Sequence, residues 1–179
     1  MKKDLIIEIP KGTNIKYEVE NGKLRVDRIL FGAGKYPMDY GFFENTLDWD
    51  GDPLDGLMIG DSAFIPKVIV PVRIIGAMKM IDGGETDTKL ITVIDVDPRF
   101  DHIKNLNDVP KHILKEVQDF FETYKNLQGK KVVINGFEKE KYAINELAET
   151  EALYQKYKDM NKDDFISLMK KEHPNKFSK

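Results

Sequence analysis

The sequence contains no cysteine among its 179 residues. This absence excludes disulfides, cysteine-ligated zinc and thiol catalysis, and it is compatible with a reducing compartment, so we expect a cytoplasmic protein. Histidine is scarce, and His102, His112 and His173 show none of the paired spacings of a transition-metal site. No serine lies in a nucleophile-elbow sequence, which leaves acyl-transfer chemistry with little support.

Long apolar runs are missing as well. The first apolar stretch, residues 5–9, is too short for a signal peptide or a membrane span, and no later run reaches membrane length. An excess of positive charge is also missing, since Lys plus Arg is 28, Asp plus Glu is 31, and the net charge is −3. A general nucleic-acid binder would usually be basic. We therefore expect a soluble protein with neither a membrane nor a nucleic acid as its partner.

The composition that remains is globular, with 41% hydrophobic and 33% charged residues. A chain of this length can bury a sizeable core. The sequence shows no internal repeat, linker or low-complexity segment. We therefore expect residues 1–179 to form a single domain.

Short strands are predicted over the first two thirds of the chain. Residues 15–19 alternate between apolar and charged side chains, and the Asn-Gly pair at 21–22 is a strong hairpin signal. Residues 68–75 and 89–94 are rich in valine and isoleucine. The regular spacing of short strands and turns predicts a closed or nearly closed antiparallel sheet.

Helices are predicted only late in the chain. Residues 107–108 are expected to cap a helix that carries Pro110 in its first turn. A short strand at 131–134 separates it from a second helix over about 139–158. A third, short helix is expected to begin after Asn161.

The strongest chemical feature is the acidic run DWDGDPLD at residues 48–55, which has four carboxylates in eight residues. Its glycine and proline favour a loop, in which three of the acids can converge on a small volume. Such crowding of like charge is costly unless cations occupy the site. The alternative is a solvated turn whose acids face water.

Two familiar binding loops can be tested against the sequence. An EF-hand beginning at Asp48 would need glycine at Pro53 and glutamate at Ile59, together with flanking helices. A phosphate-binding loop ending in GAGK at 32–35 would need its first glycine at Ile29. Neither requirement is met.

A second acidic pair, Asp82 and Asp87, flanks the glycines at 83–84. If the connection takes four residues, the two carboxylates face each other across a hairpin, which is unfavourable without an intervening cation. Asp87 and Lys89 are two residues apart, so on a strand they share one face. An ordinary polar hairpin tip is the alternative.

A third set of candidate residues is basic or phenolic, namely Lys16, Arg28, Tyr40, Tyr124 and Lys125. Counted from the turn at 21–22, Arg28 falls in line with apolar side chains. Either a bulge or twist frees it, or it points into an interior cavity. Taken one at a time, such tyrosines usually belong to a core and such lysines are usually solvated.

Carboxylates without histidine partners indicate a hard cation. Mg²⁺ fits best, because it binds a few carboxylates together with the oxygens of a phosphate substrate. The acidic loops and the nearby basic residues therefore predict a magnesium-dependent hydrolase of a small phosphate anhydride.

Taken together, the motifs resemble those of the soluble, magnesium-dependent inorganic pyrophosphatases with a β-barrel fold, in their short prokaryotic form. The resemblance runs in order from about Leu5 to Phe137, and the last forty or so residues match weakly. It is carried by EIP at 8–10, IKYE at 15–18, VDR at 26–28, YP at 36–37, YG at 40–41, DGDPLD at 50–55, KM at 79–80 followed by Asp82, Asp87 and Lys89, DHI at 101–103, and FFETYK at 120–125.

The resemblance implies a mainly β fold with helices, namely a five-stranded closed OB-type antiparallel barrel. Its core would span about residues 5–137, and a C-terminal helical extension would span about 138–179. The implied reaction is hydrolysis of pyrophosphate to two orthophosphates by a magnesium-activated water. The implied assembly is a homo-oligomer, with a homohexamer as the first expectation.

Site residues follow from the same resemblance. Asp52 would be the general base. The magnesium ligands would be Asp50, Asp55, Asp82 and Asp87, with Glu18 and Glu8 supporting a further, weaker metal position. The groups that hold phosphate would be Lys16, Arg28, Tyr40, Lys89, Tyr124 and Lys125.

Two other functions are compatible with these features. One is a metal-binding or phosphate-sensing module that keeps the fold without turnover. The other is an OB-type oligonucleotide binder, which the acidic balance and the clustered aspartates disfavour.

Overall fold

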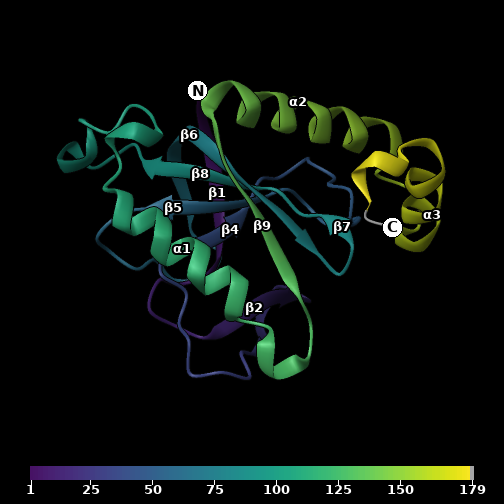
Figure 1. Ribbon diagram of the computed structural model, residues 1–179, viewed down its shortest axis with the longest axis horizontal. Helices are drawn as coiled ribbons and strands as arrows, with labels where there is room; N and C mark the ends of the chain where they lie inside the picture. Colours follow the sequence, from purple (N-terminus) through teal and green to yellow (C-terminus); the bar gives the residue numbers. More distant parts are fainter. Residues whose placement is uncertain (178–179) are drawn as a thin grey trace.

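A closed ring of five strands forms the centre of the computed structural model, which describes residues 1–177 (Figure 1). In ring order these are β1 (Lys2–Ile9), β4 (Asp39–Phe42), β5 (Asp55–Ile59), β8 (Lys89–Ile94) and β6 (Ile69–Asp82). Pairing between β6 and β1 closes the ring. The five-stranded barrel expected from the sequence is therefore confirmed.

One seam of the barrel differs from the expected antiparallel arrangement. Four neighbouring pairs are antiparallel, but β5 and β8 are parallel. The reason is topological: β8 inserts between β5 and β6, which run in opposite directions, so it must be parallel to one of them. The expectation of a wholly antiparallel barrel was wrong at this seam.

Two further pairings extend the sheet, and one hairpin forms a sheet of its own. At its far end β6 forms a tight hairpin with β7 (Glu85–Thr86). The strand β9 (Val132–Lys139) pairs along the outer part of β6, and it is longer than the predicted strand at 131–134. The hairpin of β2 (Ile15–Glu20) and β3 (Lys23–Ile29) forms a separate two-stranded sheet.

The β2–β3 hairpin has the predicted turn and an additional bulge. Asn21 and Gly22 both have positive φ, at 51° and 75°, as a type I′ turn requires. Lys16 pairs with Arg28 while the next residue, Tyr17, pairs with Val26, so Asp27 is an extra residue on β3. A bulge therefore explains why Arg28 departs from the apolar alternation.

The apolar face predicted for this hairpin is only partly covered. Leu24 and Val26 are about half exposed, as is Ile29. The side chain of Val19 lies outside what the structure describes. Because the hairpin stands apart from the barrel strands, this face meets solvent within one chain.

Helices cover the outside of the barrel (Figure 1). The helix α1 (Lys111–Thr123) packs against β9, and α2 (Glu140–Tyr157) lies along β6 and β9. The third helix, α3 (Lys162–Glu172), begins after Asn161 as predicted, and Asn161 accepts a hydrogen bond from the backbone of Asp163. None of the helices within residues 1–177 is long and apolar enough to cross a membrane.

The predicted cap of α1 was wrong. Residues 107–108 belong to a separate 3₁₀ turn, η2 (Leu106–Asp108), whose capping box joins Asn105 and Asp108. Pro110 is itself the N-cap of α1, with extended ψ of 124°. The remaining 3₁₀ turns are η1 (Pro98–Phe100), η3 (Asn126–Gln128) and η4 (Pro174–Lys176).

Three groups of buried side chains hold the elements together. One joins the barrel to α1 through Phe120 and Phe121. A second joins the barrel to α2 through Ala143 and Leu147. The third is separate and lies beneath the C-terminal helices, around Trp49.

Candidate active site

The predicted site residues meet where β5 and β8 begin. The parallel register pairs Asp55 with Lys89, and Lys89 Nζ lies 2.5 Å from Asp55 Oδ2. The hydroxyl of Tyr40 on β4 donates a hydrogen bond to the same Asp55 oxygen. The parallel seam therefore joins the acidic loop to Lys89.

Lys89 is the central charge of the site. Its side chain is 3% exposed, and its ammonium group also pairs with Asp87, which confirms that the two residues share a face. Burial opposes the positive charge, but Asp55 and Asp87 outweigh it and raise the pKa of Lys89 well above the ordinary value. The two ion pairs therefore favour the charged form of Lys89.

Asp82 meets the two residues that follow α1. Lys125 forms an ion pair with Asp82 Oδ2, and the Tyr124 hydroxyl donates to the same oxygen over 3.3 Å. Burial, together with the negative charges of Asp82 and Asp87, raises the pKa of Tyr124 despite the opposing effect of Lys89. The phenol consequently remains protonated and able to donate.

The connection between Asp82 and Asp87 differs from the predicted one. Asp82 pairs with Glu85, so the turn occupies only residues 83–84. The backbone N–H of Asp87 donates instead to the carbonyl of Met80 over 2.9 Å. The condition of a four-residue connection, under which the two aspartates would face each other across the hairpin, is therefore not met.

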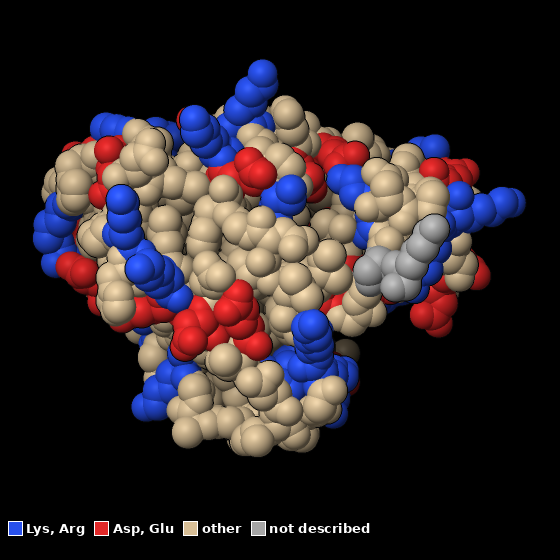
Figure 2. Space-filling view, in the orientation of Figure 1, with Lys and Arg blue, Asp and Glu red and all other residues tan. Residues whose placement is uncertain are grey.

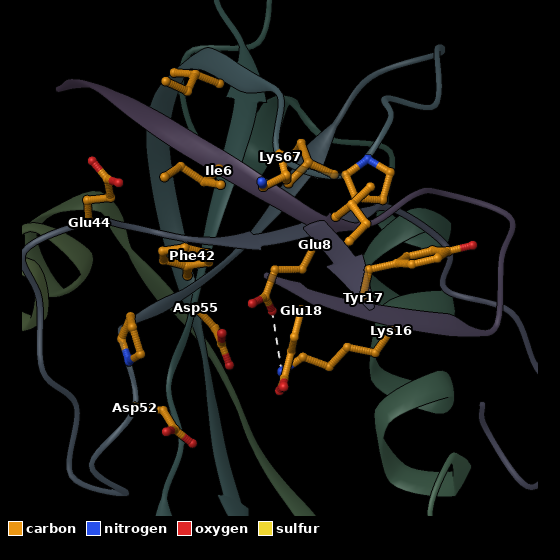
Figure 3. A pocket seen from close by; sticks show the side chains of 15 residues that line it. Ile6, Glu8, Lys16, Tyr17, Glu18, Phe42, Glu44, Asp52, Asp55 and Lys67 are labelled. Carbon is orange, nitrogen blue, oxygen red and sulfur yellow. Dashed lines mark ion pairs between the residues drawn. The ribbon is translucent and has the colours of Figure 1, made fainter. Parts of the chain in front are cut away.

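A cleft of about 650 Å³ lies on the other side of Asp55, between the acidic loop and the β2–β3 hairpin (Figure 3). Its polar lining includes Glu8, Lys16, Glu18, Asp52 and Asp55. Lys16 Nζ lies 3.3 Å from Glu8 Oε2, the pair joined by the dashed line in Figure 3. Burial, only partly offset by Lys16, raises the pKa of Glu8 to about 7.

The acidic loop buries part of its own charge. Asp48 is almost fully buried and accepts a hydrogen bond from the backbone of Trp49 over 2.8 Å. Burial, followed by repulsion from Asp87, raises the pKa of Asp50 to about 7. Asp52 is different, because its side chain is 60% exposed. The solvated-turn alternative therefore describes Asp52 but not Asp48 or Asp50.

Arg28 projects from the hairpin bulge. Its Nε lies 3.2 Å from Asp27 Oδ2 and its side chain is half exposed. The guanidinium group is close enough to interact electrostatically with Tyr36, Tyr40 and Tyr124. The bulge thus turns Arg28 toward the phenols of the site.

The structure brings the predicted acids and bases together as ion pairs. Across residues 1–177, no three acidic or histidine side chains already surround one point as metal ligands would. The predicted ligands that have cationic partners are Glu8 with Lys16, Asp55 and Asp87 with Lys89, and Asp82 with Lys125. The predicted metal ligands are therefore neighbours, but they are not a preformed ligand set.

One residue beside the site had no signal in the sequence. Lys162 Nζ lies 2.5 Å from Asp52 Oδ1, although the two residues are 110 positions apart. A lysine at the first position of a helix is ordinary, so no local motif marks it. Only the docking of α3 on the acidic loop reveals this contact.

Comparisons with known proteins point to one family. The profile of the family described as inorganic pyrophosphatase matches residues 5–162. The chain is 58% identical to an inorganic pyrophosphatase of Malacoplasma penetrans over 99% of each chain. It is 56% identical to one of Ureaplasma parvum over the whole of both. The crystal structure of inorganic pyrophosphatase from Thermus thermophilus superposes with a TM-score of 0.82 at 42% identity, covering 86% of this chain and 91% of that one.

We expect Asp50→Asn to stabilise the protein in metal-free buffer. The folded-state pKa of about 7 lies above the ordinary 3.8, so the folded state binds more protons between these values and loses stability as pH rises through them. The amide removes this cost. By differential scanning calorimetry in EDTA at pH 8, the melting temperature should rise by about 2–8 °C, and the gain should shrink at pH 5.

The same substitution should weaken Mg²⁺ binding in a calorimetric titration. Asp119→Asn, at an exposed position on α1, is the matched control and should change neither quantity. A melting temperature of Asp50→Asn that is unchanged or lower at pH 8 would contradict the electrostatic cost assigned to Asp50.

Proposed function

The chain belongs to the inorganic pyrophosphatase family, and on that premise we propose that it hydrolyses inorganic pyrophosphate to two orthophosphates. The observation that carries this proposal for the chain's own residues is Lys89, buried between Asp55 and Asp87. A cation between carboxylates offers a phosphate contact and hard-metal ligands in the same small volume.

Members of this family depend on a divalent metal ion, and we infer that Mg²⁺ serves here. The donor chemistry fits, because all the ligands proposed are carboxylates, and burial with mutual repulsion raises the pKa of Asp50 and of Asp87. A bound cation would relieve that cost. The residues that would hold it are Asp50, Asp55, Asp82 and Asp87, with Glu18 and Glu8 at a further position. When bound, the ion supplies Lewis acidity toward phosphate oxygens and water.

Asp52 is the proposed general base. Its carboxylate lines the same cleft as Asp55 and is exposed enough to meet water. It accepts the proton of the water whose oxygen attacks one phosphorus. The bond from that phosphorus to the bridging oxygen breaks, and the second orthophosphate leaves with the bridging oxygen.

The proposed phosphate-binding groups are Lys16, Arg28, Tyr40, Lys89, Tyr124 and Lys125. Most of them are bonded to carboxylates in this structure, and Lys89 is the clearest example. Substrate binding is then an exchange of partners, in which ammonium and phenol groups turn from carboxylates to phosphate oxygens. Because these groups already lie within the site, little reorganisation is required.

We also propose that the chain acts as a single domain (residues 1–179) and as a cytoplasmic homo-oligomer, with a homohexamer as the first candidate. Exposed apolar side chains support an assembly. Leu24, Val26 and Ile29 of the hairpin, Ile65 before β6, and Ile69 at the start of β6 remain exposed in one chain. Leu24 and Ile69 also line the cleft that contains Asp52 and Asp55.

Both competing functions have less support. Figure 2 shows acidic and basic groups side by side, with no continuous basic stripe on this face, which disfavours an oligonucleotide binder. A sensing module would need the phosphate-binding cations but not an exposed carboxylate such as Asp52 in the cleft.

Phosphate release from pyrophosphate is the direct test of the function. The purified protein should release two orthophosphates per pyrophosphate with Mg²⁺, and release should fall to background in EDTA. Calcium alone should not support turnover, because it takes more ligands at longer distances and loses the compact geometry. Binding of pyrophosphate without release would identify a sensing module instead.

Substitutions at Asp52 and Lys125 should affect different kinetic constants. Asp52→Asn keeps the size but cannot take a proton, so kcat should fall by roughly two to four orders of magnitude with KM little changed. Lys125→Ala removes a charge that contacts phosphate in both ground and transition states, so KM should rise. Steady-state kinetics of the two variants separates these effects.

Tyr124→Phe serves as a milder comparison, because it deletes only a hydroxyl. It should fold normally and lose a modest part of its activity. A near-normal kcat for Asp52→Asn would end the assignment of Asp52 as the base.

A further inference from the structure

Residues 162–177, here called the C-terminal segment, contact both acid-bearing parts of the site. The segment comprises α3, η4 and Phe177, and it lies beside β7 at one end of the molecule (Figure 1, yellow). It touches the acidic loop at 48–55 and the hairpin at 82–87, which are distant in sequence. Each contact is formed by specific side chains.

Apolar packing joins the segment to the acidic loop. Trp49, the single tryptophan of the chain, is 1% exposed and packs with Tyr157, Phe165 and Met169. The ring of His173 lies edge-on to Trp49 with the centroids 5.2 Å apart. Trp49, which stands between Asp48 and Asp50 in the sequence, therefore anchors the acidic loop to the C-terminal segment.

The first turn of α3 also lies directly on the loop. A Cβ atom added to Gly51 would come within 2.8 Å of Lys162 Cγ, so a larger residue at this position would require the lysine side chain or the loop to shift. Lys162 Nζ lies 2.5 Å from Asp52 Oδ1. The helix thus covers the loop between the proposed ligand Asp50 and the proposed base.

Polar contacts join the segment to the hairpin. Lys170 Nζ lies 2.9 Å from Glu85 Oε1, and the Thr86 hydroxyl donates to the carbonyl of Lys176 over 2.7 Å. Glu85 also forms an isolated antiparallel bridge with Phe177. These contacts fall on the two residues between the turn and Asp87.

Lys176 links the two sets of contacts. Its Nζ lies 4.6 Å from the centroid of the Trp49 ring, a cation–π arrangement. The same group pairs with Glu149 at 2.8 Å and Glu146 at 3.6 Å on α2. One lysine therefore connects the loop, the hairpin and the outer helix.

We propose that the C-terminal segment is a positioning element that sets the spacing between the acidic loop and the 82–87 hairpin, and thereby raises the affinity of the site for its metal. The inference rests on the proposed function, which assigns Asp50, Asp55, Asp82 and Asp87 as ligands. Ligands held by their supporting residues lose less freedom on binding an ion. A segment that touches both loops is placed to supply this restraint.

A charge-neutral substitution in the packed interior tests the proposal. Phe165→Ala loosens the contact with Trp49 without altering any charge near the acids. We expect the Kd for Mg²⁺, measured by calorimetry without substrate, to rise about three- to tenfold, below the 10–100-fold typical of residues that touch ligands directly. At saturating Mg²⁺, kcat should stay within about twofold of wild type, because no group in contact with substrate has changed.

A charge substitution on the exposed face of α3 provides a second test. Lys170→Glu breaks the contact with Glu85, while Lys171→Glu makes the same charge change at a neighbouring exposed position that has no ion pair within residues 1–177. If only the electrostatic attraction between the protein and Mg²⁺ mattered, the added negative charge would tighten Mg²⁺ binding in both variants. Positioning predicts weaker binding for Lys170→Glu alone, with recovery in the double variant Glu85→Lys, Lys170→Glu.

The outcomes are distinct. If Phe165→Ala lowers the melting temperature but leaves the Kd for Mg²⁺ unchanged, the segment stabilises the fold without positioning the metal ligands, and the proposal is wrong. Lys170→Glu binding Mg²⁺ as tightly as Lys171→Glu would overturn the proposal as well. A wild-type protein that binds Mg²⁺ but releases no phosphate would contradict the proposed function, and it would leave the comparison of affinities intact.

Discussion

Crowded negative charge is the constraint on which the rest of the structure depends. The site holds several carboxylates close together at one end of the barrel, where burial and mutual repulsion both oppose ionisation. Lysines from different elements balance this charge, in the pairs Glu8 with Lys16, Asp55 and Asp87 with Lys89, Asp82 with Lys125, and Asp52 with Lys162. Since these lysines come from β2, β8, the end of α1 and α3, the charges balance only when the fold is complete.

Signals that act over a few residues could be predicted from the sequence. The Asn-Gly turn at 21–22, the acidic loop at 50–55 and the start of α3 after Asn161 all follow from local turn, loop and cap chemistry. The regular spacing of strands and turns predicted a closed or nearly closed sheet, whereas the five-stranded OB-type barrel and the identity of the enzyme came from the ordered motifs of a family. The roles of the individual site residues remain predictions, although the structure places most of them within one neighbourhood.

Features that depend on pairing between distant segments could not be predicted from local sequence signals. The valine- and isoleucine-rich run at 89–94 predicts β8 as a strand, but it carries no information that β8 pairs in parallel with β5, and this seam decides that Asp55 meets Lys89. The length of the turn at 83–84 sets which residue faces Asp82, and glycines there fit either length. Lys162 reaches Asp52 only because α3 docks on the loop.

We infer that carboxylates and lysines exchange partners when metal and phosphate bind, and a crystal structure with Mg²⁺ and orthophosphate would reveal this exchange. The decisive quantity is the position of Lys89 Nζ, which in this structure lies 2.5 Å from Asp55 Oδ2. We expect Lys89 Nζ to move to a phosphate oxygen and Asp55 and Asp87 to coordinate Mg²⁺. A complex in which Lys89 still pairs with both carboxylates, and the ions bind elsewhere, would contradict this inference.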